Sequence, residues 1–299
     1  MFDEGQYFAP VVRSPDGTVE VQLGDGHPGV HDGDYRRRRN EIAALALDWG
    51  LGDPLPVAAY TDAEQEVWRT VSRELARKHA TYACREFLVG AARLRLPTDH
   101  VPQLAEVSAG LGGLTGFSYL PAAGLVPLRE FYGALADARF YSTQYIRHDS
   151  VPFYTPEPDV IHEVLGHANA LASDRFARLY RLAGQAARRV VADEALEFVS
   201  RVFWFTLEFG AVHEGGELRA YGAGILSSFG EIEEFRSMTI RPLDLAAMGS
   251  ADYDITQYQP LLFSARSFDE VEDVVGEFFA TCDDESIAAL RARAARATP

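Results

Sequence analysis

Apolar residues along the chain recur mostly with the spacing of α-helices, and a few short apolar runs have the character of strands. The longest helical pattern runs from Asp62 to Phe87, with Thr61 as its N-cap and Glu64 at the position that completes a capping box. Further helices are predicted at 34–47, 101–111, 127–136, 175–191, 193–209, 268–281 and 285–296. Strands are predicted at 117–121, 140–146 and 258–264, and a glycine-containing turn at 221–228. The pattern therefore predicts a mainly α-helical fold with a few short strands.

The N-terminal part differs from the rest in composition. Residues 1–25 are rich in Gly, Asp and Pro and have no sustained period, so we expect a variable, loosely ordered segment there. Residues 26–299 contain neither a repeat nor a long linker. A chain of 299 residues can form one large core, and we expect 26–299 to be a single domain.

Charge and composition exclude several classes of partner. The formal net charge is −16, which argues against nucleic acid and anionic membranes as partners. No apolar run approaches the roughly 20 residues of a membrane span, and the N-terminus does not resemble a signal peptide, so we expect a cytoplasmic protein. The basic run 36–39 has acids on both sides and is predicted to be a solvated helical face with local ion pairs.

A pair of histidines carries the first chemical signal. His162 and His167 are five residues apart, which on a regular helix is about 140° of rotation, against about 40° for a spacing of four. The zinc-protease pattern needs the spacing of four, and Gly166 occupies that position here. For both imidazoles to reach one ion, the helix must bend, end or bulge near Leu165 and Gly166.

A lone acid in an apolar segment adds to this signal. Glu208 lies within the run 203–209, which is otherwise rich in aromatic residues, and a charge there needs a compensating partner. Two imidazoles and one carboxylate are the protein ligands of non-haem iron(II) oxygenases. A pairing of Glu208 with Arg201 and an exposed helix edge explain the acid about as well. The residues by themselves leave these alternatives open.

Four longer motifs resolve the class. They are 143–148 (TQYIRH), 154–167 (YTPEPDVIHEVLGH), 204–210 (WFTLEFG) and 221–231 (YGAGILSSFGE), with support from 27–29 and 102–104. In this order they resemble the catalytic domain of the pterin-dependent aromatic amino acid hydroxylases. The resemblance extends from about residue 26 to the last predicted helix. It implies the single catalytic domain of that family, mainly α with a few short strands, and assigns 26–299 to it.

The resemblance also implies a role for individual residues. The positions that match the iron ligands are His162, His167 and Glu208. Those that match substrate-binding residues are Arg147, Thr155, Pro158, Asp159, Trp204, Phe209, Ser227 and Ile255. Arg147 would pair with the substrate carboxylate, because a guanidinium fork suits that planar anion. Those that match pterin-binding residues are Gly124, Val126, Leu128, Phe131, Glu163 and Phe203, and Tyr154 matches a catalytic position near iron and pterin.

The activity implied is hydroxylation of the ring of a free aromatic amino acid with Fe(II), O2 and a tetrahydropterin. Trp204 is typical of phenylalanine and tyrosine hydroxylases, whereas Ile255 is typical of tryptophan hydroxylases. We therefore favour 4-hydroxylation of phenylalanine to tyrosine, with tryptophan hydroxylation and phenylalanine 3-hydroxylation as alternatives. A zinc-dependent hydrolase and a non-catalytic binding protein are the alternatives from other classes.

The chain departs from the family pattern near the proposed cofactors. Ala168 and Asn169 follow His167 where Val-Pro is usual, and Phe203 replaces a usual tyrosine. The long C-terminal tetramerisation helix of animal relatives has no counterpart, so we expect a monomer or small homo-oligomer.

Overall fold

The computed structural model describes residues 10–254 and 257–297. Its longer helices are α1 (Gly33–Asp48), α2 (Asp62–Tyr82), α3 (Arg85–Leu94), α4 (Leu104–Leu114), α5 (Leu128–Ala136), α7 (Asp174–Arg189), α8 (Asp193–Phe203) and α14 (Asp284–Ala297). Shorter helices are α6 (Asn169–Leu171), α9 (Ala223–Ser227), α10 (Glu231–Glu234), α11 (Leu245–Ser250), α12 (Phe268–Glu270) and α13 (Glu277–Thr281). Wide π-helical turns are formed by His162–Ala168, Trp204–Glu208 and Val271–Gly276, and Phe235–Ser237 is a 3-10 turn.

The strands in the described residues form three small sheets. Strands β1 (Val11–Arg13) and β2 (Val19–Val21) are an antiparallel pair, and β3 (Ser118–Pro121) and β4 (Arg139–Ser142) are a parallel pair. The third sheet has the order β6-β5-β8-β7 and contains β5 (Gly210–Glu214), β6 (Glu217–Ala220), β7 (Thr239–Pro242) and β8 (Leu261–Ala265). Only the β5–β6 pair in that sheet is antiparallel. The prediction of a mainly helical fold with a few short strands is confirmed.

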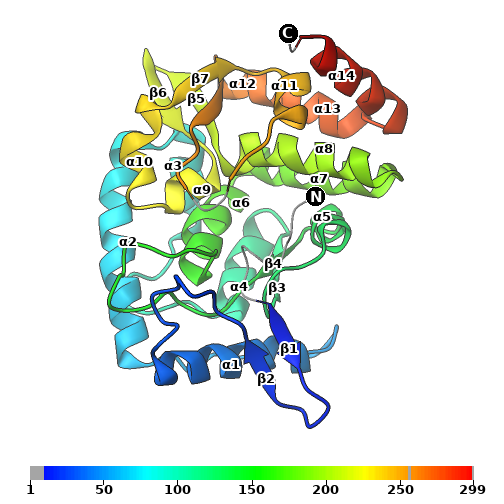
Figure 1. Cartoon of the computed structure of the whole chain (residues 1–299). Helices are drawn as coiled ribbons and strands as arrows, with labels where there is room; N and C mark the ends of the chain where they lie inside the picture. The colour runs from blue at the N-terminus through cyan, green and yellow to red at the C-terminus, as the bar shows by residue number, and fades with distance from the viewer. Residues whose placement is uncertain (1–9, 255–256, 298–299) are drawn as a thin grey trace.

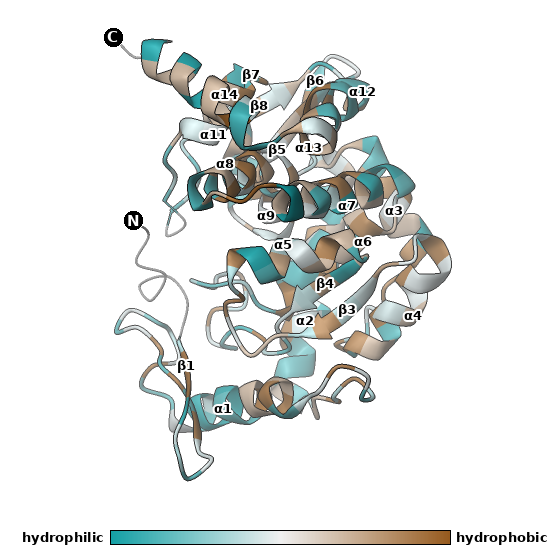
Figure 2. Cartoon of the chain, turned by 90° about the vertical axis from the view of Figure 1, so that its right-hand side faces the viewer, coloured by the Kyte–Doolittle hydropathy of each residue, from teal (hydrophilic) through white to brown (hydrophobic). Residues whose placement is uncertain are grey.

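The elements are layered around a central pair of helices. Figure 1 shows α1 and the β1–β2 hairpin at one end of the molecule, the four-stranded sheet at the other, and α2 running along one side. Helices α7 and α8 cross between these ends, and Figure 2 shows apolar residues gathered along α8 and the inner turns of α7. Fully buried Phe176, Tyr180 and Phe198 lie on these two helices, within a single large hydrophobic cluster. This cluster surrounds the segment 162–168.

The predicted helix 62–87 is wrong at its C-terminal end. The capping box at its start is present, since Thr61 and Glu64 each accept a hydrogen bond from the other's backbone. The helix ends at Tyr82, because Ala83 and Cys84 are extended and the Cys84 N–H donates to the Ala220 carbonyl over 2.8 Å. A contact with a strand distant in sequence divides the apolar pattern into α2 and α3.

The N-terminal segment is more ordered than predicted over the described residues 10–25. Val19 and Val21 of β2 pack on Ala43 of α1, and the Val21 N–H donates to Asn40 Oδ1 over 2.8 Å. The expectation of a loosely ordered segment is therefore wrong for the β1–β2 hairpin. Residues 1–9 lie outside the described residues.

The basic run 36–39 is a solvated face only in part. Arg36 and Arg37 are exposed and pair with acids, as predicted. The Arg39 side chain is buried, bonds Glu157 over 3.0 Å and lies 3.4 Å from the centre of the Tyr145 ring. Arg39 therefore connects α1 to the loop that precedes His162, which a solvated face would not do.

Candidate metal centre and substrate pocket

The two histidines lie on a turn whose hydrogen bonding explains their spacing. His162–Ala168 is a π-helical turn, in which residues five apart rather than four apart lie above one another. The rings of His162 and His167 consequently lie next to each other, edge to face, with centroids 4.7 Å apart. The sequence predicted that the helix bends, ends or bulges near Gly166, and the structure shows a bulge. Its glycine serves a close approach, since a Cβ on Gly166 would lie 2.9 Å from the Ala223 carbonyl oxygen of α9.

Glu208 reaches the same point from a second π-helical turn. The turn Trp204–Glu208 ends α8, and the chain leaves the helix at Phe209 to enter β5. Glu208 Oε1 lies 2.9 Å from His167 Nε2, and Glu208 Oε2 lies 3.9 Å from His162 Nε2. Arg201 instead lies 3.6 Å from Asp252. The alternative pairing of Glu208 with Arg201 is therefore absent among the described contacts.

The three side chains have the spacing of ligands around one metal. His162 Nε2 and His167 Nε2 are 3.0 Å apart. Two ligand atoms about 2.1 Å from a metal and at right angles to each other are separated by about 3.0 Å. The distances from His167 Nε2 to His162 Nε2 and to Glu208 Oε1 both fit that arrangement, so the residues present suit a facial metal site.

The outer nitrogens of both imidazoles are held by hydroxyl groups. His162 Nδ1 lies 2.8 Å from Ser227 Oγ, which donates to the Gly224 carbonyl over 3.3 Å. His167 Nδ1 lies 2.8 Å from the Tyr180 hydroxyl. A partner at Nδ1 orients each ring so that Nε2 faces the space between the three side chains.

The charges of the site favour a cation. Burial, and after it the neighbouring His167, lower the pKa of His162 to about 4, so this imidazole is neutral and able to ligate at neutral pH. Burial opposes ionisation of Glu208, but His167 and His162 outweigh it and hold the pKa of Glu208 below its usual value. The site thus combines a neutral imidazole with an ionised carboxylate.

A second carboxyl group lies beside the same cluster. Atoms of His162, Glu163 and His167 that could ligate a metal all lie within 4.8 Å of one another. Burial, followed by the carboxylates of Glu208 and Asp159, raises the pKa of Glu163 well above its usual value. A neutral acid is a poor metal ligand, so the charge state favours Glu208 over Glu163 as the third ligand.

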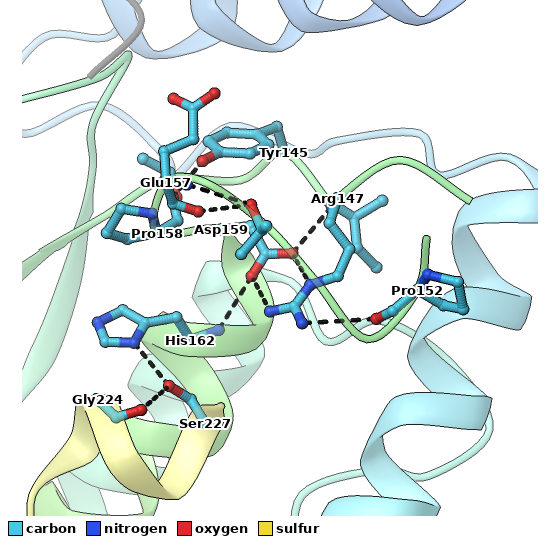
Figure 3. A network of polar contacts seen from close by, with 12 residues as sticks. Tyr145, Arg147, Pro152, Glu157, Pro158, Asp159, His162, Gly224 and Ser227 are labelled. Atoms are coloured by element: carbon cyan, nitrogen blue, oxygen red, sulfur yellow. Dashed lines mark hydrogen bonds and ion pairs between the residues drawn. The ribbon is translucent and has the colours of Figure 1, made fainter. Parts of the chain in front are cut away.

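An arginine and an aspartate form a buried pair next to the metal site. Arg147 Nε and Nη2 donate to the two oxygens of Asp159 over 2.9 and 2.8 Å, and both side chains are almost completely buried. Asp159 Oδ1 also accepts the backbone N–H of His162 over 3.2 Å (Figure 3). A single carboxylate therefore links the candidate substrate anchor to the first metal ligand.

Trp204 and Phe209, which were predicted to bind substrate, belong to a group of packed rings that we call the aromatic wall. Trp204 lies 4.5 Å from Phe209 and 4.2 Å from Tyr253, measured between ring centres. The Trp204 indole N–H donates to Gln259 Oε1 over 3.2 Å. The backbone N–H of Gln259 donates in turn to Glu231 Oε1 over 2.8 Å. The orientation of the wall thus depends on a buried carboxyl group at the start of α10.

We predict that Glu231 makes the stability of the fold depend on pH. Burial raises the pKa of Glu231 from 4.5 to about 7. Between these values the unfolded chain has lost the proton and the folded chain retains it, so stability falls as pH rises. At about 1.4 kcal/mol per pKa unit, the loss approaches about 3 kcal/mol above pH 7.

Thermal unfolding of Glu231→Gln measured between pH 5 and 8 tests this prediction. The variant should melt higher than the parent at pH 8 and lose much of the pH dependence, because its amide still accepts the Gln259 N–H. Glu234→Gln is the matched control, since Glu234 lies on the same helix and is exposed. Parallel curves for the parent and Glu231→Gln would contradict the prediction.

Other residues named from the sequence lie at varying distances from this centre. Phe131 packs edge-on against Phe140, whose ring centre is 4.6 Å from that of His167. Gly124 and Val126 line a cavity of about 550 Å³ that also includes Tyr141, the β4 residue next to Phe140. The cavity and the Phe140–His167 contact therefore both involve β4, at neighbouring residues of the strand.

Two other residues that were predicted to bind substrate form hydrogen bonds within the protein. The Thr155 hydroxyl donates to the Glu157 carbonyl over 2.7 Å, and the Pro158 carbonyl accepts from the Tyr145 hydroxyl. Tyr154 is 53% exposed. Of the other predicted site residues, Leu128 is the first residue of α5, and Phe203 is buried against Tyr132 and Tyr180. Ile255 lies outside the described residues.

Sequence reasoning missed several residues that support the site. Tyr180 bonds His167, Tyr119 donates to the backbone carbonyl of Glu163 over 2.6 Å, and Tyr253 and Gln259 contact Trp204. These tyrosines occur in segments whose apolar spacing also fits ordinary core positions. Only the tertiary contacts distinguish them.

Comparison with known proteins decides the family. The family model of the biopterin-dependent aromatic amino acid hydroxylases matches residues 16–288. This chain belongs to that family. It is 56% identical over 264 residues to phenylalanine 3-hydroxylase of Streptomyces coeruleorubidus, covering 88% of this chain and 95% of that protein. It is 41% identical over 267 residues to phenylalanine-4-hydroxylase of Bos taurus, covering 87% of this chain and 59% of the bovine one.

Solved structures of bacterial family members have the same fold. Phenylalanine hydroxylase of Chromobacterium violaceum, with bound iron(III) and 7,8-dihydrobiopterin, matches with a TM-score of 0.72 at 30% identity, over 83% of this chain and 87% of that one. The apo enzyme of Colwellia psychrerythraea matches with a TM-score of 0.73 at 28% identity, over 83% and 94%. The hydroxylase fold expected from the sequence is therefore confirmed. Among the described residues, no helix has the length and apolar character needed to cross a bilayer.

Proposed function

We propose that this hydroxylase acts on free L-phenylalanine and adds the hydroxyl group at C3 of the ring. The observation that supports the substrate class is that the Asp159 carboxylate bonds both the Arg147 side chain, the proposed substrate anchor, and the backbone N–H of His162. The C3 position is supported by the 56% identity to a phenylalanine 3-hydroxylase over 95% of its length, against 41% to a 4-hydroxylase over 59%. The sequence motifs favour C4 instead. The identity of the hydroxylated product therefore decides between the two positions.

The metal ligands in this proposal are His162, His167 and Glu208. Iron(II) bound there, together with a tetrahydropterin, supplies the activated oxygen for the ring. Ser227 was expected to be a substrate-binding residue, but its hydroxyl is engaged with His162 Nδ1 and the Gly224 carbonyl. We therefore assign Ser227 the task of orienting His162.

The substrate carboxylate is assigned to Arg147. Its guanidinium has five N–H donors, and Asp159 and the Pro152 carbonyl accept three of them. The remaining donors can form a bidentate pair with a carboxylate. Trp204, Phe209, Pro158 and Ile255 are proposed to enclose the ring, and Thr155 to lie near the amino acid backbone.

We assign the pterin to the side of the turn His162–Ala168 that is opposite the proposed substrate site. Phe131 is proposed to stack on it, with Gly124, Val126 and Leu128 along its edge and Phe203 behind. Glu163 is neutral because burial raises its pKa, so it can donate a hydrogen bond to the pterin. Tyr154 is proposed to lie near the space between iron and pterin.

Product analysis tests the proposal. Purified protein is supplied with iron(II), a tetrahydropterin and phenylalanine, and the products are separated by chromatography against meta-tyrosine and para-tyrosine standards. We expect meta-tyrosine as the main product. Para-tyrosine would overturn the C3 assignment, and turnover of tryptophan in place of phenylalanine would overturn the substrate. Tight zinc binding with hydrolytic activity would overturn both.

The proposal also covers the domain bounds, the partners, the location and the oligomeric state. We assign the catalytic domain to residues 26–299. The net charge of −16 supports a protein with neither nucleic acid nor membrane as partner, and we propose a cytoplasmic monomer or small homo-oligomer. Size-exclusion chromatography with light scattering measures the oligomeric state.

A further inference from the structure

A buried phenol contacts the second histidine of the metal centre. Tyr180, on α7, is 0% exposed and His167 is 1% exposed. The Tyr180 hydroxyl lies 2.8 Å from His167 Nδ1. The Tyr180 ring packs edge-on against Phe203 at 5.3 Å, and the Phe140 ring lies 4.6 Å from that of His167. Apolar rings thus surround this hydrogen bond.

The Tyr180 oxygen suits the tautomer of His167 that ligates a metal. A neutral imidazole that ligates through Nε2 carries its proton on Nδ1. On His167 that proton would be donated to the Tyr180 oxygen, which lies 2.8 Å from Nδ1.

The other histidine has a hydroxyl partner of the same kind. Ser227 Oγ donates to the Gly224 carbonyl over 3.3 Å, so it is an acceptor towards His162 Nδ1 (Figure 3). This arrangement holds His162 in the tautomer that ligates through Nε2. Both ligands therefore have a hydroxyl oxygen at Nδ1, from Ser227 of α9 and from Tyr180 of α7.

We propose that Tyr180 is a positioning residue of the metal centre, because its hydroxyl orients the His167 ring and holds it in the tautomer that ligates through Nε2. The inference rests on the ligand set proposed above. It assigns to α7, a helix that contributes no ligand, a direct effect on metal affinity.

Cobalt(II) binding to Tyr180→Phe tests this inference without any need for turnover. The variant keeps the ring and loses the hydroxyl, so His167 Nδ1 loses the hydrogen-bond partner that orients the imidazole. We expect cobalt(II) affinity to fall about 10- to 100-fold, as for other residues that support a metal ligand. Tyr132→Phe is the matched control, because it removes a buried hydroxyl that lies 3.1 Å from Ser200 Oγ. Its cobalt(II) affinity should equal that of the parent.

A ligand variant separates failure of this inference from failure of the ligand set. If His167→Ala binds cobalt(II) as the parent does, the ligand set is wrong and the inference falls with it. If His167→Ala loses cobalt(II) but Tyr180→Phe binds like Tyr132→Phe, the ligand set stands and the role of Tyr180 is overturned.

A measurement on the unmodified protein covers the case in which Tyr180→Phe fails to fold. Nitrogen-15 spectra of the histidines, recorded on zinc-loaded protein, report which ring nitrogen of His167 carries the proton. We expect a slowly exchanging proton on His167 Nδ1, protected by its hydrogen bond to the Tyr180 oxygen. A rapidly exchanging proton on Nδ1, or none there, would overturn the proposal.

Discussion

Replacing Glu208 with glutamine is expected to abolish iron binding and hydroxylation while leaving the fold intact. The amide is nearly isosteric with the carboxylate but carries no charge, so the site loses its one ionised ligand. Because Glu208 would contact the metal directly, the loss of affinity should exceed the roughly 10- to 100-fold effect of outer-sphere residues. Isothermal titration with iron(II) under anaerobic conditions measures the affinity. Far-UV circular dichroism checks the fold.

Glu163→Gln is the matched comparison for Glu208→Gln. Both residues are buried glutamates beside the same histidines, but Glu163 is neutral in the folded chain since burial raises its pKa. We expect Glu163→Gln to bind iron(II) with nearly the affinity of the parent, whatever its effect on pterin use. Metal should also raise the melting temperature of Glu163→Gln but not that of Glu208→Gln. The reverse result would identify Glu163 as the third ligand.

The histidine spacing shows how far sequence reasoning extends. A distance of five residues excludes a pair on one face of a regular helix, and this was enough to predict that the helix bends, ends or bulges near Gly166. The form of the bulge was not predictable, because a π-helical turn is stabilised by packing and not by local preference. Gly166 illustrates the difference. Its role depends on Ala223 of α9, which is far away in the sequence.

The missed features share this cause. The end of α2 at Tyr82 depends on a hydrogen bond from Cys84 to β6, and the burial of Arg39 depends on Glu157 and Tyr145. Local patterns report periodicity and capping, which is why Thr61 and the helix start were predicted correctly. They do not report which distant segment meets a residue. The supporting role of Tyr180 was invisible for the same reason.

Replacing Arg147 with lysine is expected to lower kcat/KM for phenylalanine roughly 30-fold or more. Loss of one partner from a buried charge pair costs about 2–5 kcal/mol, and about 1.4 kcal/mol corresponds to a factor of ten. Lysine is chosen because Asp159 is completely buried and needs a cation beside it, which a lysine still provides. A lysine ammonium acts as a point charge and cannot present a planar fork to the substrate carboxylate. Steady-state kinetics with saturating pterin measures the effect.

A substrate analogue distinguishes loss of carboxylate binding from a general distortion of the site. L-Phenylalaninamide has the ring and the amino group but no carboxylate, so the parent should prefer phenylalanine strongly over the amide. If Arg147 binds the carboxylate, Arg147→Lys loses most of that preference, and its activity towards the amide stays close to that of the parent. Distortion would instead reduce activity towards both substrates by the same factor. A variant that retains both the parental preference and the parental activity towards phenylalanine would show that the carboxylate is bound elsewhere.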